Sequence, residues 1–324
     1  MYTYDVILAA YNGEKFIEQQ IDSILNQSVQ PQHIFIRDDA SSDNTCVILN
    51  KFNNIKNITI IRGEYNLGYV KNFECLVSKT TSDIVFFSDQ DDVWLPNKAE
   101  ILLSELYNNE SSTTVFSDAY IVSEDLVEIG YLWWQVGFSL NKNNIRNILN
   151  GNYVTGATMA VKREFLVSLI PFPNDVPHDF YIAFTSLLKN SLLPVDEKLI
   201  KYRQHSLNVI GIKKRSFIWR FFNAFGRDAV NKRLRSYIEK QQLLDKGVKE
   251  NPDALNDFIQ CYHMYMSIVR FFYCDKIKSS QNWYASTETA LYKKLKAYFS
   301  FSSTKKTIMN VYDFVFIKIH KNKV

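Results

Sequence analysis

The sequence predicts an α/β domain in which a mostly parallel sheet is covered by helices on both faces. Short apolar runs bounded by polar residues alternate with segments in which apolar residues recur at helical spacing. This alternation is typical of parallel sheets that are buried on both sides. Ligands bind such sheets at the carboxyl ends of the strands, so the polar residues that follow each strand are the candidates for a site.

The expected elements follow one another along the first third of the chain. Strands are expected at 6–10, 34–36, 58–61 and 84–87, each an apolar run bounded by polar residues. Helices are expected between them at 16–25, after the capping residues 41–43, and at 70–77. Beyond these, 114–118 and 199–205 are predicted strands and a helix is expected to run from 178 to 188. Residues 124–150 carry no clear pattern.

The acidic stretch SDQDDVW, residues 88–94, directly follows the strand expected at 84–87. It places Asp89, Asp91 and Asp92 within four positions, where like charges repel and raise one another's pKa. A hard divalent cation such as Mg²⁺ or Mn²⁺ would remove that cost, and Mg²⁺ commonly bridges to substrate phosphates. The stretch therefore predicts a metal–diphosphate site. The alternative is an acidic loop that only caps the next helix.

Composition indicates a globular chain with an uneven charge distribution. The 324 residues are 46% hydrophobic with only 10 Gly and 7 Pro, which excludes a disordered chain and allows one large domain or two moderate ones. The net charge of +4 is too small to predict nucleic-acid binding. Residues 211–249 hold 11 Lys/Arg against 3 Asp/Glu, a local net charge of +8. This basic segment is the charge asymmetry that needs an explanation.

Cysteine usage and hydropathy bear on the compartment. The four cysteines, Cys46, Cys75, Cys261 and Cys274, form no Cys-x-x-Cys pair, which favours free thiols in a reducing compartment. Asp5 precedes the first apolar run, so a secretory signal is not expected. No apolar stretch reaches the roughly 20 residues that a membrane-spanning helix needs. Any membrane contact is therefore expected to be peripheral.

Two common nucleotide-binding motifs are absent from the predicted sheet. A dehydrogenase would carry G-x-G-x-x-G after the first strand, where residues 9–13 read AAYNG with a single glycine. No G-x-x-x-x-G-K-[ST] is present for a P-loop. A nucleotide would have to be held in another way.

Four motifs in order point to a family: AAYN at 9–12, RDDASSD at 37–43, NLGYVKNF at 66–73 and SDQDDVW at 88–94. Together they resemble the N-terminal half of inverting family 2 glycosyltransferases with the GT-A fold, and within that family the bacterial rhamnosyltransferase-like enzymes of surface-polysaccharide (O-antigen or capsule) assembly. The resemblance implies a Rossmann-like mixed sheet with helices on both faces. We expect this catalytic domain at 1–214, followed by a helical C-terminal extension at 215–324.

The resemblance also implies a site for a nucleotide sugar at the strand ends. Asp38 would accept a hydrogen bond from the N–H of a uracil or thymine base, Asp39 would support the same loop, and Tyr11 would lie against base and ribose. Alternatively, Asp38 caps a helix and Lys71 is a solvated helix residue. The implied nucleotide-sugar set is Ala9, Ala10, Tyr11, Asn12, Asp38, Asp39, Gly68, Lys71, Asn72, Asp89 and Gln90.

The D-x-D stretch supplies the implied metal ligands. Asp91 would bind Mn²⁺ or Mg²⁺ directly, and Asp89 would contact the ribose or a metal-bound water. His205 matches a histidine that completes metal coordination in several relatives, although a lone histidine is often structural. Asp92 is left without an assigned role beyond shaping the site.

A second group of residues is implied around the reacting sugar. Asp179 would be the general base that deprotonates the acceptor hydroxyl, unless it only caps the helix that follows. Many relatives have Glu-Asp where this chain has His178-Asp179. Trp94, Thr155, Gly156 and His178 are expected to line the acceptor or sugar pocket, although Trp94 could be a core aromatic. Trp133-Trp134 could stack on a sugar or anchor a buried loop.

The predicted reaction is metal-dependent transfer of a hexose with inversion. The expected donor is dTDP-L-rhamnose, with UDP-glucose or UDP-galactose as the alternative. The expected acceptor is a hydroxyl of an undecaprenyl-diphosphate-linked glycan, and the enzyme would act peripherally on the inner face of the plasma membrane. The basic extension could bind that anionic surface, cover the site as a lid or form a homodimer. No nucleic-acid partner is expected. A non-catalytic nucleotide- or glycan-binding module is the alternative from another class.

Overall fold

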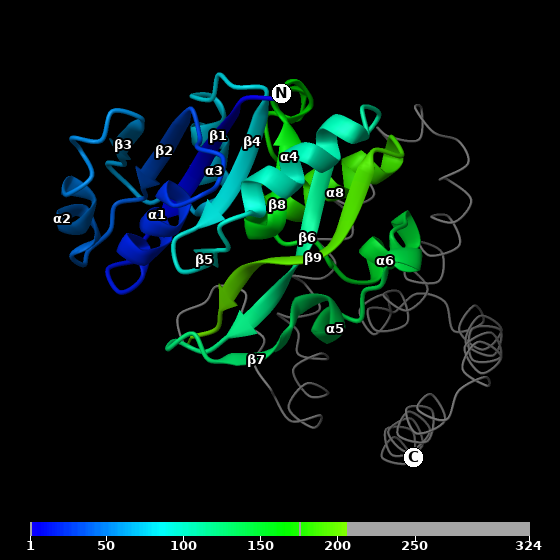
Figure 1. Cartoon of the computed structure of the whole chain (residues 1–324). Coiled ribbons are helices and arrows are strands. Elements are labelled where there is room, and N and C mark those ends of the chain that lie inside the picture. Colours follow the sequence, from blue (N-terminus) through cyan, green and yellow to red (C-terminus); the bar gives the residue numbers. More distant parts are fainter. Residues whose placement is uncertain (1, 175, 206–324) are drawn as a thin grey trace, which may run out of the picture. The chain divides into compact units, whose positions relative to one another are not determined.

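The structure is a computed structural model that describes residues 2–174 and 176–205 (Figure 1). The predicted boundary at Lys214 and the predicted C-terminal extension lie outside the described residues. The strands are β1 (Tyr4–Ala10), β2 (His33–Asp38), β3 (Ile58–Arg62), β4 (Ile84–Asp89), β5 (Val93–Trp94), β6 (Thr114–Val122), β7 (Glu128–Tyr131), β8 (Met159–Lys162) and β9 (Leu192–Arg203). The α-helices are α1 (Ile17–Leu25), α2 (Thr45–Asn50), α3 (Tyr69–Val77), α4 (Lys98–Asn108), α5 (Leu132–Val136), α6 (Ile145–Asn150), α7 (Arg163–Ser168) and α8 (His178–Leu188), with 3₁₀ turns η1 (Leu140–Lys142) and η2 (Gly156–Thr158).

All strands belong to one mixed sheet in the order β3-β2-β1-β4-β8-β6-β9-β5, with β7 paired to β6. The first four strands are parallel, as the alternation of strand and helix predicts. The second half is mixed because β8 runs antiparallel to both β4 and β6, whereas β9 runs parallel to β6. The mixed sheet expected from the family resemblance is therefore confirmed.

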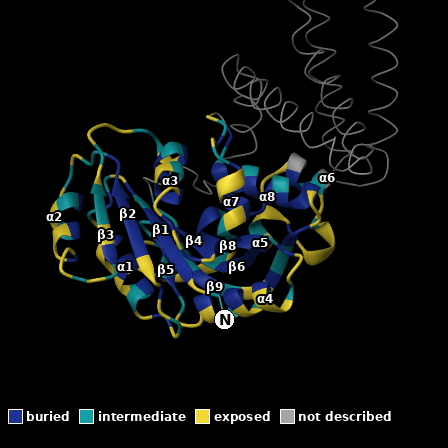
Figure 2. Ribbon diagram, turned by 90° about the horizontal axis from the view of Figure 1, so that it is seen from above, coloured by how far each residue is buried: buried dark blue, intermediate teal, exposed yellow. Residues whose placement is uncertain are grey.

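Helices cover both faces of the sheet. Seen from above, α3, α7 and α8 lie on one side of the strands, and α1 and α4 lie on the other (Figure 2). Val6 and Leu8 of β1 belong to the core that includes Ile17 and Ile21 of α1, and the intervening Ile7 is fully buried too. Because successive side chains of a strand point to opposite faces, burial of all three explains the uninterrupted apolar run of the first strand.

The structure extends the predictions in two places. The last strand, β9, has 12 residues and begins at Leu192, well before the predicted start at 199. Its register with β6 shifts near Asp118, and this irregular region contains the exposed Asp196 and Glu197, whose polarity hid the strand. The patternless residues 124–150 form β7, α5, η1 and α6. None of the helices within the described residues has the length and apolar character that crossing a bilayer requires.

Candidate active site

The carboxyl ends of β1, β2 and β4 meet at one rim of the sheet. In the register, Ala9 lies opposite both Arg37 and Asp89, and Ala10 lies opposite Asp38. The central strand β1 therefore places the loop after β2 on one side and the acidic loop after β4 on the other.

A side-chain amide joins the loops after β1 and β4. Gln90 accepts a hydrogen bond from the backbone N–H of Tyr11 at 2.7 Å and donates to the Tyr11 carbonyl at 2.8 Å. The ring of Tyr11 is 47% exposed and so remains available to stack on a base. Gly13 makes this contact possible, since a Cβ there would lie 2.3 Å from Oε1 of Gln90. Gln90 thus orders the rim through the Tyr11 backbone.

Asn12 makes the corresponding link between the loops after β1 and β2. Its backbone N–H donates to Oγ of Ser41, and its side-chain oxygen accepts from the N–H of Ser42, both at 2.8 Å. Asn12 has a positive φ of 51°, a conformation that asparagine tolerates better than most residues. The motif AAYN therefore acts here mainly as a junction between neighbouring loops.

Asp38 is almost completely buried at the end of β2. Its carboxylate accepts from the hydroxyl and backbone N–H of Ser41 and from the thiol of Cys46, the last at 2.8 Å. These contacts order the turn after β2 and do not cap α2, which begins at Thr45 and whose first N–H is bound by Asp43. A carboxylate has about four lone-pair positions, so they leave capacity for a further donor.

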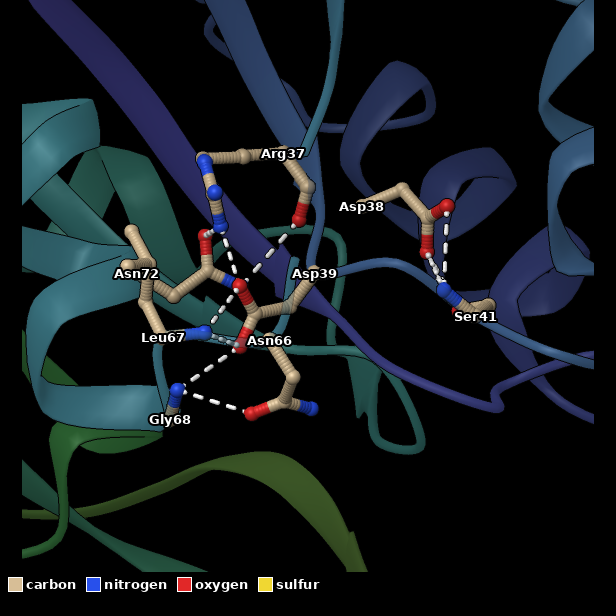
Figure 3. A network of polar contacts seen from close by, with 8 residues as sticks. All are labelled: Arg37, Asp38, Asp39, Ser41, Asn66, Leu67, Gly68 and Asn72. Carbon is tan, nitrogen blue, oxygen red and sulfur yellow. Dashed lines mark hydrogen bonds and ion pairs between the residues drawn. The ribbon is translucent and has the colours of Figure 1, made fainter. Parts of the chain in front are cut away.

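Asp39 holds the neighbouring loop together (Figure 3). It pairs with the guanidinium of Arg37 and accepts from the backbone N–H groups of Leu67 and Gly68 at 2.9–3.0 Å. Asn72 completes this buried network by contacting the guanidinium and carbonyl of Arg37. Asp39 and Asn72 both belong to the predicted nucleotide-sugar set, and Asp39 was also expected to support this loop. Both are buried with their polar atoms engaged by protein groups, so in this structure they support the loop, and a contact with the nucleotide stays a prediction.

Two further predicted residues lie on α3 and at its start. Gly68 precedes the helix with φ of +79°, a left-handed conformation that favours glycine. Lys71 points to Glu74, at 2.9–3.0 Å, and to the carbonyl oxygen of Phe172 at 3.0 Å. Lys71 therefore ties α3 to the segment before α8.

Two of the residues predicted to bind metal, Asp91 of the acidic loop and His205 after β9, lie together. Nε2 of His205 lies 2.8 Å from Oδ2 of Asp91, although the residues are 114 positions apart. Burial raises the pKa of Asp89 to about 7, helped by the charges of Asp91 and Asp179. Burial, with Asp91 and Asp89, likewise raises the pKa of Asp92 well above its usual range. The loop therefore concentrates carboxylates at a cost in free energy.

These groups fit a divalent cation that also has ligands from outside the protein. Oδ2 of Asp92 is buried without a partner among the described residues. Within the same part of the chain, no three His, Cys, Asp or Glu side chains are clustered closely enough to hold an ion by themselves. Mg²⁺ and related ions keep several waters and take phosphate oxygens, so a bound ion would need only a few protein ligands, which Asp91 and His205 could supply.

Asp179 lies in the first turn of α8 with its carboxylate buried. Its Oδ1 accepts from the backbone N–H of Phe180 at 2.6 Å. Burial raises the pKa of Asp179 to about 6, and nearby donors, including groups of Gly156 and Asn152, offset part of that rise. Asp179 and Asp89 are close enough to influence each other electrostatically. The predicted base and the acidic loop therefore lie in the same neighbourhood.

His178 packs against the turn that precedes β8. Its ring stacks on Phe87 at 5.3 Å and lies 4.4 Å from Phe73, and neither ring nitrogen has a partner among the described residues. Burial lowers the pKa of His178 to about 3, so the ring is neutral. A Cβ on Gly156 would lie 2.7 Å from Nε2 of His178. Gly156 therefore admits the ring, and Thr155 just before it is half-buried.

The tryptophans divide between core and surface. Trp94 is 2% exposed and packs on Phe86, with the Lys98 ammonium 3.6 Å from its ring. The expectation that Trp94 lines a sugar pocket is therefore wrong, because the ring is in the core beneath the loop. Trp133 is also buried, whereas Trp134 is 79% exposed, so only Trp134 could stack on a sugar.

Three residues near the site were not predicted from the sequence. Tyr69 is partly exposed, its ring lies 5.9 Å from that of His178, and burial together with the charges of Asp179 and Asp89 raises its pKa. Lys98 is fully buried and donates to the carbonyl oxygen of Ala157 at 2.6 Å. Arg203 contacts the acidic loop. The sequence offered one signal for these residues, which is that each lies in or beside a motif. Tyr69 is within NLGYVKNF, Lys98 follows SDQDDVW, and Arg203 lies two residues before His205.

Comparison with known proteins places these motifs in a family. Residues 5–167 match Glycosyl transferase family 2. The dTDP-rhamnosyl transferase RfbG of Shigella flexneri is 30% identical over 223 residues, 63% of this chain and 73% of that protein. WfgD of Escherichia coli, a UDP-Glc:alpha-D-GlcNAc-diphosphoundecaprenol beta-1,3-glucosyltransferase, is 26% identical over 62% of this chain and 77% of its own length.

Solved structures share the fold. The mannosyltransferase PcManGT from Pyrobaculum calidifontis, in complex with GDP-Man and Mn²⁺, aligns with a TM-score of 0.50 at 17% identity. The alignment covers 99% of this chain and 87% of that protein. At this identity the similarity supports the architecture of the sheet and its helices, which agrees with the topology described above.

Proposed function

The chain belongs to glycosyl transferase family 2, and from that premise we propose that it moves a hexose, with inversion, from a nucleoside diphosphate to a hydroxyl group of a lipid-linked glycan. The observation that carries the proposal is the Asp91–His205 pair in the loop after β4, with the buried carboxylates of Asp89 and Asp179 close enough to influence each other electrostatically. A nucleotide sugar bound between Asp91 and Asp179 would have its diphosphate leaving group near Asp91 and its reacting carbon toward Asp179.

Asp179 is the proposed general base. It takes the proton of the acceptor hydroxyl while that oxygen forms a bond to the anomeric carbon. The bond from this carbon to the diphosphate oxygen breaks, and the nucleoside diphosphate leaves with the electron pair. Burial supports this role, because a pKa near 6 makes Asp179 a stronger base than an exposed aspartate while keeping it mostly ionised at neutral pH.

Asp91 and His205 are the proposed protein ligands of Mn²⁺ or Mg²⁺. When bound, the ion stabilises the negative charge that develops on the leaving nucleoside diphosphate. The donor set supports this assignment, since a carboxylate and an imidazole suit Mn²⁺. The Mn²⁺ named in the PcManGT complex is consistent with it.

The proposed donor is dTDP-L-rhamnose, with UDP-glucose or UDP-galactose as the alternative. Similarity to the dTDP-rhamnosyl transferase RfbG supports the first, and similarity to the UDP-Glc-dependent WfgD supports the second. We assign base recognition to Tyr11 and Asp38. The exposed ring of Tyr11 offers a stacking surface, and the Asp38 carboxylate has acceptor capacity for the N–H that thymine and uracil share. The base contacts therefore do not separate the two donors.

The proposed acceptor is a glycan on undecaprenyl diphosphate in surface-polysaccharide assembly. The diphosphoundecaprenol in the name of WfgD supports this class of acceptor. Such an enzyme would work at the inner face of the plasma membrane, through a catalytic domain at 1–214 and an extension at 215–324. Large exposed apolar side chains on β7 and α5 support an interfacial location, and they include Ile129, Tyr131, Trp134 and Val136.

A thermal-shift screen of nucleotide sugars with and without Mn²⁺ tests the proposal. A ligand that binds only the native state stabilises the protein and raises its melting temperature. At a ligand concentration of 100 times the Kd, the stabilisation free energy is about 2.7 kcal/mol. We expect dTDP- or UDP-hexoses to stabilise the protein in Mn²⁺ and to lose most of this effect in EDTA. GDP and ADP sugars serve as controls.

Asp91→Ala is the matching variant. It should abolish Mn²⁺-dependent stabilisation and transfer, whereas Asp22→Ala, which removes an exposed carboxylate from α1, should leave both unchanged. Full activity of Asp91→Ala would remove Asp91 as a ligand. Metal-dependent binding without transfer to any lipid-linked acceptor would favour a non-catalytic binding module.

A further inference from the structure

Arg203, the last residue of β9, contacts the acidic loop through both its main chain and its side chain. Its backbone N–H donates to Oδ1 of Asp92 at 3.0 Å. Its Nε–H donates to the carbonyl oxygen of Asp91 at 2.7 Å. The residue is only 2% exposed. One residue thus restrains two successive members of the loop that carries the proposed metal ligand.

The rest of the guanidinium is held by two other segments of the chain. Nη2 donates to Oε1 of Gln19 on α1 at 2.5 Å, and Nη1 donates to the carbonyl oxygen of Glu124 in the turn after β6. The guanidinium carbon lies 4.5 Å from the ring centre of Phe16, just before α1. The ring of Phe16 is in turn 4.9 Å from the imidazole of His205. Arg203 therefore reaches both sides of the Asp91–His205 pair.

The chemistry of arginine suits this arrangement. A guanidinium presents five N–H donors in one rigid plane and stacks on aromatic faces. Arg203 uses both properties, since its edges bind Asp91, Glu124 and Gln19 while its face covers Phe16. A lysine carries the same charge on a single rotating ammonium and cannot bind three acceptors in one plane. Mutation of a group that orients a metal ligand typically costs about 10–100-fold in metal affinity or activity.

We propose that Arg203 is a positioning residue that sets the relative geometry of Asp91 and His205. It fixes the main chain of Asp91 directly, and it fixes the imidazole of His205 through Phe16 and through its place two residues earlier in the chain. The proposal rests on the proposed function of Asp91 and His205 as metal ligands. It requires no contact between Arg203 and the substrate.

Arg203→Lys tests the proposal against a matched variant elsewhere in the chain. Arg163, at the start of α7, also donates its Nε–H to a backbone carbonyl, that of Thr80 at 2.7 Å, so Arg163→Lys removes the same kind of bond away from the site. Free Mn²⁺ would be measured by electron paramagnetic resonance during titration of each full-length protein. We expect Arg203→Lys to raise the Kd for Mn²⁺ by about 10–100-fold, as other losses of ligand-orienting groups do, and Arg163→Lys to leave it unchanged.

Two further measurements keep the test independent of folding and of activity. Gln19→Ala removes only one exposed partner of the guanidinium, so the protein should remain folded and show a smaller rise in the Kd for Mn²⁺. In the metal-free protein, NMR signals of the His205 ring report its position over Phe16. These signals should shift in Arg203→Lys and stay in place in Arg163→Lys.

The outcomes separate this proposal from the proposed function. Equal Kd values for Mn²⁺ in Arg203→Lys and wild type would overturn the positioning role. If wild type binds no Mn²⁺, the metal assignment fails. The NMR signals of His205 then decide alone whether Arg203 has the positioning role. Unchanged signals in Arg203→Lys would overturn the proposal, whereas shifted signals would show that Arg203 positions a pair with another purpose.

Discussion

At the scale of single residues, burial sets the protonation of the groups around the rim. It raises the pKa of Asp179 to about 6 and that of Asp89 to about 7, and it lowers the pKa of His178 to about 3. In each case burial disfavours the charged form. A site that keeps such groups gives up stability for chemistry, because apolar or amide replacements would carry no such penalty.

The proposed base makes a prediction about pH. Asp179 must be ionised to accept a proton, so the rate of transfer should fall as the pH drops through about 6. Asp179→Asn should lower the rate by about 10²–10⁴-fold, the usual contribution of a general base, while leaving the Kd for the nucleotide sugar unchanged. Initial rates over pH 5–8 check both points. A normal rate in Asp179→Asn would remove this residue as the base.

The same substitution should stabilise the fold, with a definite dependence on pH. The folded-state pKa of Asp179 lies above its value of 3.8 in the unfolded chain, so the ionised carboxylate destabilises the native state most above pH 6. Asp179→Asn should therefore increase the free energy of unfolding at pH 7–8 by on the order of 1–3 kcal/mol. The gain should vanish below about pH 4, where both states are protonated. Urea unfolding at several pH values measures it.

At the scale of elements, the site depends on side chains that bind the backbone of a neighbouring loop. Gln90 binds both backbone groups of Tyr11, Asn12 binds the loop after β2, and Asp39 binds two N–H groups before α3. Loops at the end of a parallel sheet have no ladder partners of their own. These contacts replace that ladder and hold the loops in a common register.

Gly13→Ala tests the link between the loops after β1 and β4. The new methyl group would lie 2.3 Å from Oε1 of Gln90, so the amide must leave the Tyr11 backbone. We expect weaker nucleotide binding, by about tenfold for roughly 1.4 kcal/mol of lost ordering. Gln90→Ala should weaken nucleotide binding by a similar factor. The Gly13/Gln90 double variant should lose no more affinity than either single variant, because each of the three variants removes the same contact.

Gly151→Ala is the matched control for this pair. A Cβ at Gly151 would meet no atom within 4 Å, and its φ of −177° is an extended conformation open to any residue. The Kd for nucleotide, measured by isothermal titration, should stay at the wild-type value. Additive losses in the Gly13/Gln90 double variant would instead show that the two residues act separately.

At the scale of the whole molecule, charge separates the described domain from the segment that follows it. Residues 211–249 carry a local net charge of +8 in a chain whose total is +4, so the remainder is acidic by 4 charges. Basic residues near an anionic bilayer contribute about 1 kcal/mol each. This asymmetry is the reason for the proposed membrane role of residues beyond the described domain.

Sedimentation with vesicles tests that role. The full chain should bind vesicles containing anionic lipid, and binding should weaken as salt rises and screens the charges. A full-length variant with Arg227, Lys232, Arg233 and Arg235 changed to Gln, and a chain ending at Lys214, should both remain in the supernatant. Neutral vesicles serve as the control. Unchanged sedimentation of both variants would favour a lid or a dimer contact for the extension.

Local pattern predicted the elements and motifs that depend on neighbouring residues. The strands up to β4 were recognisable because each is an apolar run between polar residues, and SDQDDVW stood out because close carboxylates are costly. β9 was only partly recognised, since its register shift exposes acidic residues within a strand. Trp133 and Trp134 are identical in sequence terms, yet one is buried and the other 79% exposed. Their orientations depend on how α5 packs.

By itself, the sequence determined the family, the positions along the chain of the first four strands and the residue types available for chemistry. Only the tertiary structure decided which of those residues meet. Asp91 and His205 lie 2.8 Å apart across 114 positions, Asp39 faces inward to support a loop, and Trp94 lies in the core. The reason is that these outcomes depend on contacts between distant segments, and the position of Arg203 beneath the acidic loop exists only once β9 has joined the sheet.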